Sequence, residues 1–225
     1  MRRLVRSLLV AGALPMSVLP AQVTRYVRYT AAGTTSYGLL EGQTVRELRG
    51  DLFATPQPTG RTLRLDQVKL LAPVVPGKVI AVGLNYLTHL GERPAATYPG
   101  LFAKMPTSIV GPEADVIYPA DATNLHFEGE LVVVIGRRAQ NVSVADAPRY
   151  VFGVTAGNDI SERDWQRADL QWFRAKASDT FGPLGPTLVT GLNYGDLLNL
   201  TAKVLRENPQ VRRALQKKYQ HLFTI

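Results

Sequence analysis

Short runs of alternating hydrophobic and polar residues follow one another from residue 23 onward. Three of them, Thr24–Thr30, Ser36–Leu40 and Thr44–Leu48, are separated by turn residues around Gly33 and Gly42. Alternation of this kind predicts β-strands, and the short spacing predicts hairpins. We therefore expect a small β meander of about 50 residues, which leads into a connector rich in Pro and Thr over residues 51–60.

Beyond the connector, the chain continues with short apolar runs and few helical segments. Helical periodicity or a capping residue predicts short helices at residues 85–92, 144–149 and 161–171. Strands outnumber helices and do not alternate with them regularly, so we expect a mixed α/β, predominantly β fold rather than a doubly wound sheet. The predicted strands are Val79–Val82, Val116–Tyr118, Leu131–Ile135, Tyr150–Ala156 and Thr187–Val189.

The two ends of the chain differ from its middle. Arg2, Arg3 and Arg6 precede an apolar stretch that ends at Ala21, which is the pattern of a secretory signal peptide. The stretch is too short and too interrupted by proline to span a membrane. We expect a periplasmic or secreted protein if this signal is real, and a cytoplasmic one otherwise. The last residues, 205–225, form an atypical basic tail.

Charge and composition exclude several classes of function. The net charge of +8 lies wholly in residues 1–21 and 203–225, and the segment between them is neutral. A protein that binds nucleic acid carries a basic patch on its folded body, so we do not expect a nucleic-acid partner. The absence of cysteine excludes disulfides, Cys-ligated zinc, iron–sulfur clusters and thiol catalysis.

Two carboxylates open one of the predicted strands. Glu128 and Glu130 are two residues apart, so on a strand they point to the same face, while Phe127, Leu131 and Val133 face the expected core. Their mutual repulsion favours a cation between them, and oxygen ligands alone favour a hard ion such as Mg²⁺ or Mn²⁺. The alternative is an exposed strand end at which both acids are solvated. Asp159 is either a third ligand or an ordinary helix N-cap.

A histidine and a glutamate lie on the first predicted helix. His89 and Glu92 are three residues apart and would share a helix face. A carboxylate that orients a histidine makes it a better general base. The alternative is a surface contact of no catalytic consequence.

Together, these segments resemble the fumarylacetoacetate hydrolase family. The chain matches the family's motifs in order at five places: VIAVGLNYLTHLGE (79–92), LFAKMPTSIVG (101–111), FEGELVVVIG (127–136), GNDISERD (157–164) and WFRAKASDTFGPLGP (172–186). The resemblance implies a β-roll of mixed sheets with short helices. It places a small N-terminal β domain and connector at residues 22–72, after the signal peptide of residues 1–21. The catalytic domain would occupy residues 73–204 and be incomplete at its C-terminal end.

The resemblance also implies a role for each candidate residue. Glu128, Glu130 and Asp159 would bind Mg²⁺ or Mn²⁺. His89 and Glu92 would form a catalytic dyad, with Lys176 as a further catalytic residue. The substrate, a small oxo acid, would be held by Lys104, Arg163 and Gln166.

Three activities follow from the resemblance. The first is metal-dependent hydrolysis or lysis of a C–C bond in acylpyruvate-like or fumarylpyruvate-like oxo acids, through a metal-bound enolate. The second is decarboxylation or isomerisation of 2-hydroxyhepta-2,4-diene-1,7-dioate-type substrates through the same enolate. The third is an inactive family member, because strands that follow residue 200 in the family, with a G-T-P-x-G-type stretch, have no counterpart here. By analogy with the family we expect a homodimer without a stable membrane anchor.

Overall fold

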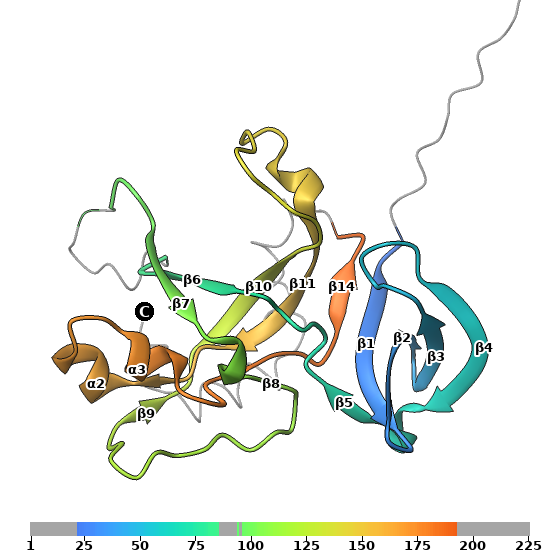
Figure 1. Ribbon diagram of the computed structural model, residues 1–225, viewed down its shortest axis with the longest axis horizontal. Helices are drawn as coiled ribbons and strands as arrows, with labels where there is room; N and C mark the ends of the chain where they lie inside the picture. Colours follow the sequence, from blue (N-terminus) through green and yellow to red (C-terminus); the bar gives the residue numbers. More distant parts are fainter. Residues whose placement is uncertain (1–21, 86–93, 95, 193–225) are drawn as a thin grey trace, which may run out of the picture.

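A computed structural model describes residues 22–85, 94 and 96–192 of the chain (Figure 1). Its main sheet has eight strands, seven of them in the order β10-β11-β14-β1-β2-β3-β4, while β5 pairs with β1. These strands are β1 (Thr24–Ala31), β2 (Thr34–Glu41), β3 (Thr44–Arg49), β4 (Gln57–Arg64), β5 (Lys69–Leu71), β10 (Gly129–Ile135), β11 (Val151–Asn158) and β14 (Leu188–Thr190).

Short strands and helices surround the part of this sheet that β10, β11 and β14 form. Three further strand pairs are formed by β6 (Val79–Gly83) with β7 (Gly100–Lys104), β8 (Ile109–Val110) with β13 (Gly182–Pro183), and β9 (Leu125–His126) with β12 (Ser161–Glu162). The helices are short: α2 (Arg163–Ala168), α3 (Phe173–Ala177) and the 3₁₀ turns η1 (Leu65–Gln67), η2 (Pro106–Ser108) and η3 (Ala147–Tyr150). The fold is therefore mixed but mostly β, as the sequence predicts.

The N-terminal strands form an antiparallel meander with a small core of its own. Val27, Tyr29 and Val45 are almost completely buried there. Gly38 lies opposite this core, and a Cβ atom at that position would come within 2.5 Å of Val45 Cγ1. A glycine is needed at residue 38 because the side chains of Val45 and Tyr29, on the neighbouring strands β3 and β1, occupy the space that a Cβ atom would need.

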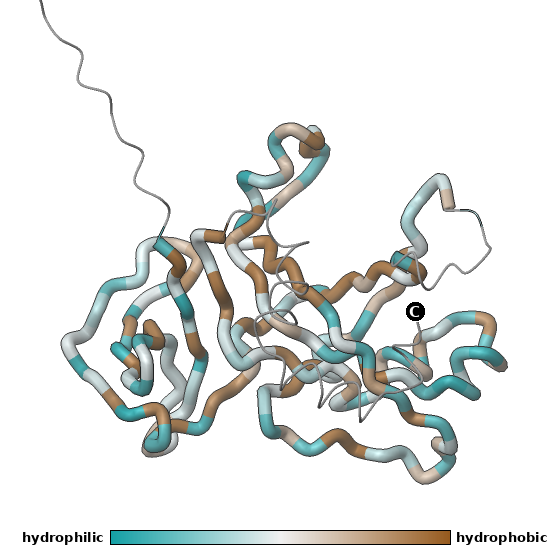
Figure 2. The backbone as a smooth tube through the Cα atoms, turned by 180° about the vertical axis from the view of Figure 1, so that it is seen from behind, coloured by the Kyte–Doolittle hydropathy of each residue, from teal (hydrophilic) through white to brown (hydrophobic). Residues whose placement is uncertain are grey.

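Strand β14 joins this meander to the later half of the chain. It pairs with β1 on one side, where Leu188 lies opposite Tyr26, and with β11 on the other, where Val189 lies opposite Val154. Leu188 is fully buried in the second hydrophobic cluster, which also contains Val134. Hydrophobic residues accordingly run along the central strands, while the outer loops carry both hydrophilic and hydrophobic residues (Figure 2). The predicted N-terminal β unit and the later strands thus share one sheet.

Most of the predicted strands are present, and the differences have simple causes. Strand β4 lies within a segment predicted to begin as a connector. Its residues are nearly all exposed, so the strand has no hydrophobic alternation that would reveal it. The expected strand at Val116–Tyr118 does not form. The segment after Ser143 forms the 3₁₀ turn η3, and residues 161–171 form only the short helix α2.

The side chains of strand β10 that face the core are the opposite set to the one predicted. Leu131 and Val133 are 51% and 48% exposed, whereas Val134 is 8% exposed and belongs to the core cluster. Because side chains alternate along a strand, Glu130 and Val134 share the inward face. The expectation that Leu131 and Val133 face the core was wrong, since a run of five apolar residues does not show which alternate set is buried.

No helix in the part of the chain that the structure describes is long and apolar enough to cross a membrane. The predicted signal peptide at residues 1–21 and the tail at 205–225 lie outside the described residues.

Candidate functional site

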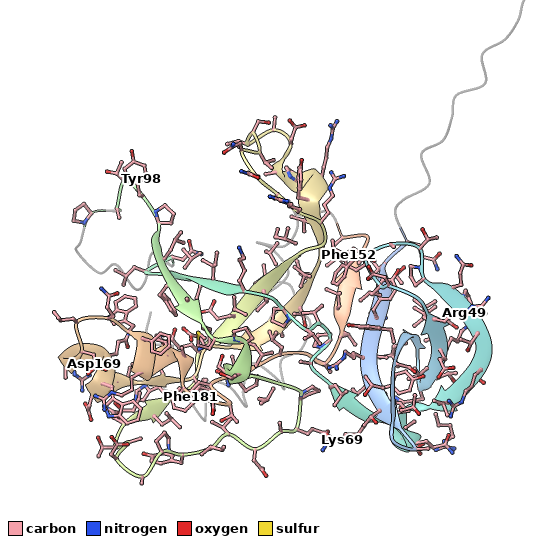
Figure 3. All side chains as sticks on the ribbon, viewed as in Figure 1. Arg49, Lys69, Tyr98, Phe152, Asp169 and Phe181 are labelled. Atoms are coloured by element: carbon pink, nitrogen blue, oxygen red, sulfur yellow. The ribbon has the colours of Figure 1, made fainter. Side chains whose placement is uncertain are left out.

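Five charged side chains from different elements converge beside the end of β11. Lys104 is the last residue of β7, Glu128 directly precedes β10, and Asp159 directly follows β11. Arg163 is the first residue of α2, and Lys176 lies in α3. Phe181, which is labelled in Figure 3 and completely buried, adjoins this cluster because its carbonyl accepts a hydrogen bond from the backbone N–H of Ile160.

Lys176 lies between the two acidic groups. Its Nζ donates to Glu128 Oε1 at 2.9 Å and to Asp159 Oδ2 at 2.7 Å. The Lys176 side chain is only 3% exposed. A buried ammonium remains charged only where it is paired, so these two carboxylates account for its burial.

Lys104 completes the pairing of Asp159 from the opposite side. Its Nζ lies 2.5 Å from Asp159 Oδ1 and also donates to the backbone carbonyl of Lys176. Burial lowers the pKa of Lys104, and the neighbouring ammonium of Lys176 lowers it further, although Asp159 acts in the opposite direction. Both oxygens of Asp159 are therefore bound to lysine side chains.

Glu128 is held by side chains from the segment that follows β11. Arg163 Nη2 lies 2.6 Å from its Oε1, and Ser161 Oγ donates to the same oxygen at 3.0 Å. Burial raises the pKa of the Glu128 carboxyl, but the ammonium of Lys176 and the guanidinium of Arg163 outweigh this effect, so the net direction is downward. Glu128 is thus held as a carboxylate.

The backbone also joins the segments that carry the two acids. The Asn158 side-chain oxygen accepts from Glu128 N at 2.9 Å, and Asp159 N donates to Glu128 O at 2.8 Å. These bonds extend the β10–β11 ladder, in which Glu130 lies opposite Gly157. Two sequence segments that are 30 residues apart are therefore held side by side.

The remaining predicted site residues fall into three groups. Gln166 adjoins the cluster because its Oε1 accepts from Arg163 Nη1 at 2.7 Å. Glu130 is partly buried on the inward face of β10. His89 and Glu92 lie outside the described residues, so their predicted dyad stays a prediction.

The donor set fits a hard divalent cation in its chemistry. Glu128 and Asp159 offer carboxylate oxygens to a single cationic nitrogen, and Glu130 is a partly buried carboxylate two residues further along the chain. In the described part of the chain, no three acidic or histidine side chains lie close enough together to form a complete metal site. Two of the three predicted ligands thus meet around Lys176.

Two further residues belong to this environment without having been predicted. Ser161 contacts Glu128, and Glu162, which is completely buried, caps helix α2 through Trp165 N at 2.6 Å. The sequence signal for both is their place in the GNDISERD segment (157–164), two and three residues after Asp159. The sequence offers Asp159 as a candidate for the cap, but Glu162 has that function, and the Asp159 side chain binds two lysines.

Comparison with known proteins places the chain in a family. The sequence model of the fumarylacetoacetate hydrolase C-terminal domain matches residues 78–221, more than half of the chain. The protein belongs to the fumarylacetoacetate hydrolase family. A second model, of a Rv2993c-like N-terminal domain, matches residues 24–73. The C-terminal match includes most of the tail that was expected to depart from the family pattern.

Individual relatives agree with this assignment. The chain is 48% identical over 165 residues to protein Rv2993c of Mycobacterium tuberculosis, covering 72% of this chain and 62% of that protein. It is 43% identical over 139 residues to the human mitochondrial oxaloacetate tautomerase FAHD2A, covering 60% of this chain and 44% of that protein. The chain therefore spans between 44% and 62% of the length of these relatives.

Solved structures show the same fold. The structure of 2-hydroxyhepta-2,4-diene-1,7-dioate isomerase from Mycobacterium marinum matches with a TM-score of 0.69 at 42% identity, covering 76% of this chain and 67% of that one. A 5-carboxymethyl-2-hydroxymuconate delta-isomerase from Mycobacterium smegmatis matches with a TM-score of 0.70 at 43% identity, covering 75% and 68%. The family and fold class expected from the sequence are thereby confirmed.

Proposed function

We propose that this protein is an enzyme that acts on small 2-oxo acids through an enolate, with a divalent cation bound beside β10 and β11. The observation that carries the proposal is the meeting of Glu128 and Asp159 around the buried ammonium of Lys176. Together with Lys104 and Arg163, these five side chains carry three positive and two negative charges. Such a cluster attracts an anion.

The cation would be held by Glu128, Glu130 and Asp159, and their carboxylate oxygens favour Mg²⁺ or Mn²⁺. When bound, it would act as a Lewis acid for the developing enolate. Glu130 would bring the cluster to neutrality before the cation arrives, so the loaded site would have an excess positive charge. An anionic oxo acid would restore the balance.

The cationic side chains would then bind and orient the substrate. Arg163 presents a planar guanidinium that suits a carboxylate, and Gln166 fixes its orientation through Nη1 at 2.7 Å. Lys176 Nζ, which donates to Glu128 and Asp159, would also donate to the reacting oxygen of the substrate. Lys104 would hold Asp159 in place from the far side.

Keto–enol isomerisation is the reaction that the described residues support best. It requires stabilisation of an enolate and movement of a proton, and the cluster supplies charged groups for both steps. Two relatives are named oxaloacetate tautomerase and 2-hydroxyhepta-2,4-diene-1,7-dioate isomerase, which supports substrates of this class. Hydrolysis of a C–C bond would additionally require a base that activates water, for which His89 with Glu92 is the candidate.

The test begins with the purified full chain, with and without Mg²⁺ or Mn²⁺. We expect accelerated interconversion of the enol and keto forms of oxaloacetate, followed by ultraviolet absorbance. Glu130→Ala should abolish this acceleration, while Glu41→Gln, an exposed change in β2, should have no effect. Activity that survives the Glu130 change, or excess chelator, would contradict the proposal.

A second assay separates hydrolysis from isomerisation. Cleavage of an acylpyruvate releases pyruvate, which a coupled dehydrogenase detects. If the protein hydrolyses such substrates, His89→Ala should abolish pyruvate release and leave isomerisation in place. Loss of both activities in this variant would show that His89 also serves the proton transfer.

We also propose that the protein forms a homodimer, by analogy with the family. Light scattering coupled to size-exclusion chromatography would show the mass of two chains. A monomer at micromolar concentration would contradict this assembly.

A further inference from the structure

A completely buried carboxylate lies next to the charged cluster but is not part of it. Glu162 has no exposed surface, and the mechanism proposed above makes no use of it. Its Oε2 accepts from Trp165 N at 2.6 Å, while its Oε1 accepts from Asn124 N at 2.6 Å and from Thr123 N at 3.2 Å. One side chain therefore satisfies three backbone N–H groups from two separate segments.

This arrangement exceeds what a helix cap needs. An ordinary N-cap accepts from one or two backbone N–H groups of its own helix, and serine or aspartate is long enough for that. Glu162 uses one oxygen for α2 and the other for the loop that leads into β9. The extra methylene group of glutamate allows it to bind both segments at once.

The same loop returns a hydrogen bond to the neighbouring residue. Asn124 O accepts from Arg163 N at 2.9 Å, so the loop that Glu162 holds also fixes the backbone of Arg163. The pairing of β12 with β9, in which Glu162 lies opposite Leu125, adds to this connection. From that fixed position, the Arg163 guanidinium reaches Glu128 at 2.6 Å.

We propose that Glu162 is a positioning residue, whose buried carboxylate clamps the loop that leads into β9 to the start of α2. This clamp holds Arg163 on Glu128 and, during turnover, on the substrate carboxylate. Its effect on turnover rests on the function proposed above, whereas its effect on the position of Arg163 does not. The nearby Asp164 bonds the same loop through the side chains of Thr123 and Asn124, at an exposed position.

Substitutions at residue 162 separate the two halves of the clamp. In Glu162→Gln, one carboxylate oxygen is replaced by an NH₂ group, which faces a backbone donor whichever way the amide is turned. Glu162→Asp keeps the charge and can still cap α2, but it is one methylene group too short to reach the loop as well. Asp164→Asn is the matched control, because it removes a carboxylate that contacts the same loop and leaves the clamp intact.

The first measurement uses the side-chain ¹⁵N signals of Arg163 in the metal-free protein, assigned by their loss in Arg163→Lys. We expect slow exchange of its Nη hydrogens in the wild type and in Asp164→Asn. In Glu162→Gln and Glu162→Asp, exchange should be about tenfold faster, the size expected when one charge-assisted hydrogen bond is lost. Unchanged Arg163 signals together with a lower melting temperature would show a purely structural role and overturn the proposal.

The second measurement uses steady-state kinetics. A variant that is merely less well folded has fewer active molecules, which lowers kcat and leaves KM unchanged. Displacement of Arg163 should instead raise KM, by about tenfold, because a charged contact with the substrate is lost. The double variant Glu162→Gln/Arg163→Lys should be no worse than Arg163→Lys alone. Independent, multiplying losses would overturn the proposal.

The two proposals can fail separately. If the wild type turns over no 2-oxo acid, the proposed function fails, and the ¹⁵N measurement still decides whether Glu162 positions Arg163.

Discussion

Removing the buried ammonium of Lys176 gives the most direct test of the charged cluster. In Lys176→Met the side chain keeps most of its volume and loses its charge, so that packing changes little. Glu128 and Asp159, whose side chains are 16% and 7% exposed, then lose a shared partner at 2.9 and 2.7 Å. Their carboxylates repel each other in a site with little water.

The size of the effect follows from the burial. Removing one partner of a buried ion pair costs about 3–5 kcal/mol, because the other charge stays buried. Glu128 keeps Arg163 and Asp159 keeps Lys104, so we expect a value near the lower limit, about 3 kcal/mol. For a protein of this size, that corresponds to a decrease in Tm of about 6–12 °C.

The assay is thermal unfolding followed by circular dichroism, without divalent cations and then with Mn²⁺. Arg46→Met is the control, because its pair with Glu41 is half exposed and is worth at most about 1 kcal/mol. Mn²⁺ should raise the Tm more in Lys176→Met than in the wild type, since the cation replaces the missing positive charge. An equal Tm decrease in the two methionine variants, or no response to Mn²⁺ in Lys176→Met, would refute this reasoning.

Three further predictions concern the sheet and the titrating groups. Gly153→Ala places a Cβ atom 2.4 Å from the Val189 carbonyl, so it should weaken the β11–β14 pairing and lower the free energy of unfolding in urea by about 1–3 kcal/mol. Gly129→Ala, whose Cβ atom meets open space, should leave the free energy of unfolding unchanged. Equal effects of the two changes would contradict the tight packing at residue 153. Burial raises the pKa of Tyr29 to about 12, so the folded state keeps this proton where the unfolded state releases it, and stability should fall as the pH rises above 10. Tyr29→Phe should lack that slope in denaturant midpoints measured from pH 9 to 12, and an identical slope would contradict the shift. Although burial raises the pKa of Glu128, its cationic neighbours bring this pKa below 4.5. The contribution of Glu128 to the stability of the folded state is therefore complete above pH 4.5 and is lost as the pH falls further. The stability of Glu128→Gln should fall less steeply with acid than that of the wild type, and parallel curves would exclude this linkage.

The sequence predicted the elements that have a hydrophobic pattern and missed those that lack one. Strands β1, β2 and β3 were predicted to within two residues at each end, because turn residues around Gly33 and Gly42 delimit them and β1 has its buried residues at alternate positions. Strand β4 has no such alternation, since it lies at the edge of the sheet with nearly all of its residues exposed. The pairing of β14 with β1 depends on contacts between distant residues, which local periodicity does not encode.

The sequence predicted which residues form the charged cluster, but not which of them pair with one another. Residues Glu128, Asp159, Lys104, Lys176 and Arg163 were all predicted from motifs, and the structure brings them together. Which cation pairs with which carboxylate was not predictable, because the residues come from five separate elements. The facing of β10 was likewise predicted wrongly, since its apolar run offers two equivalent sets of alternate residues.

The order of the residues after β11 explains how Asp159 comes to be part of the cluster. An acid at a strand-to-helix junction normally turns back to cap the helix. Here the chain first makes the short strand β12, and helix α2 begins only at Arg163, so the cap position falls on Glu162. Glu162 satisfies the helix N-terminus, and the Asp159 side chain remains free to bind Lys104 and Lys176. If residue 162 were unable to cap α2, the nearest carboxylate before it in the chain would be that of Asp159. A turn of the Asp159 side chain toward the helix would take its carboxylate away from Lys104 and Lys176. The two residues of β12 therefore separate the structural acid from the acid of the charged cluster.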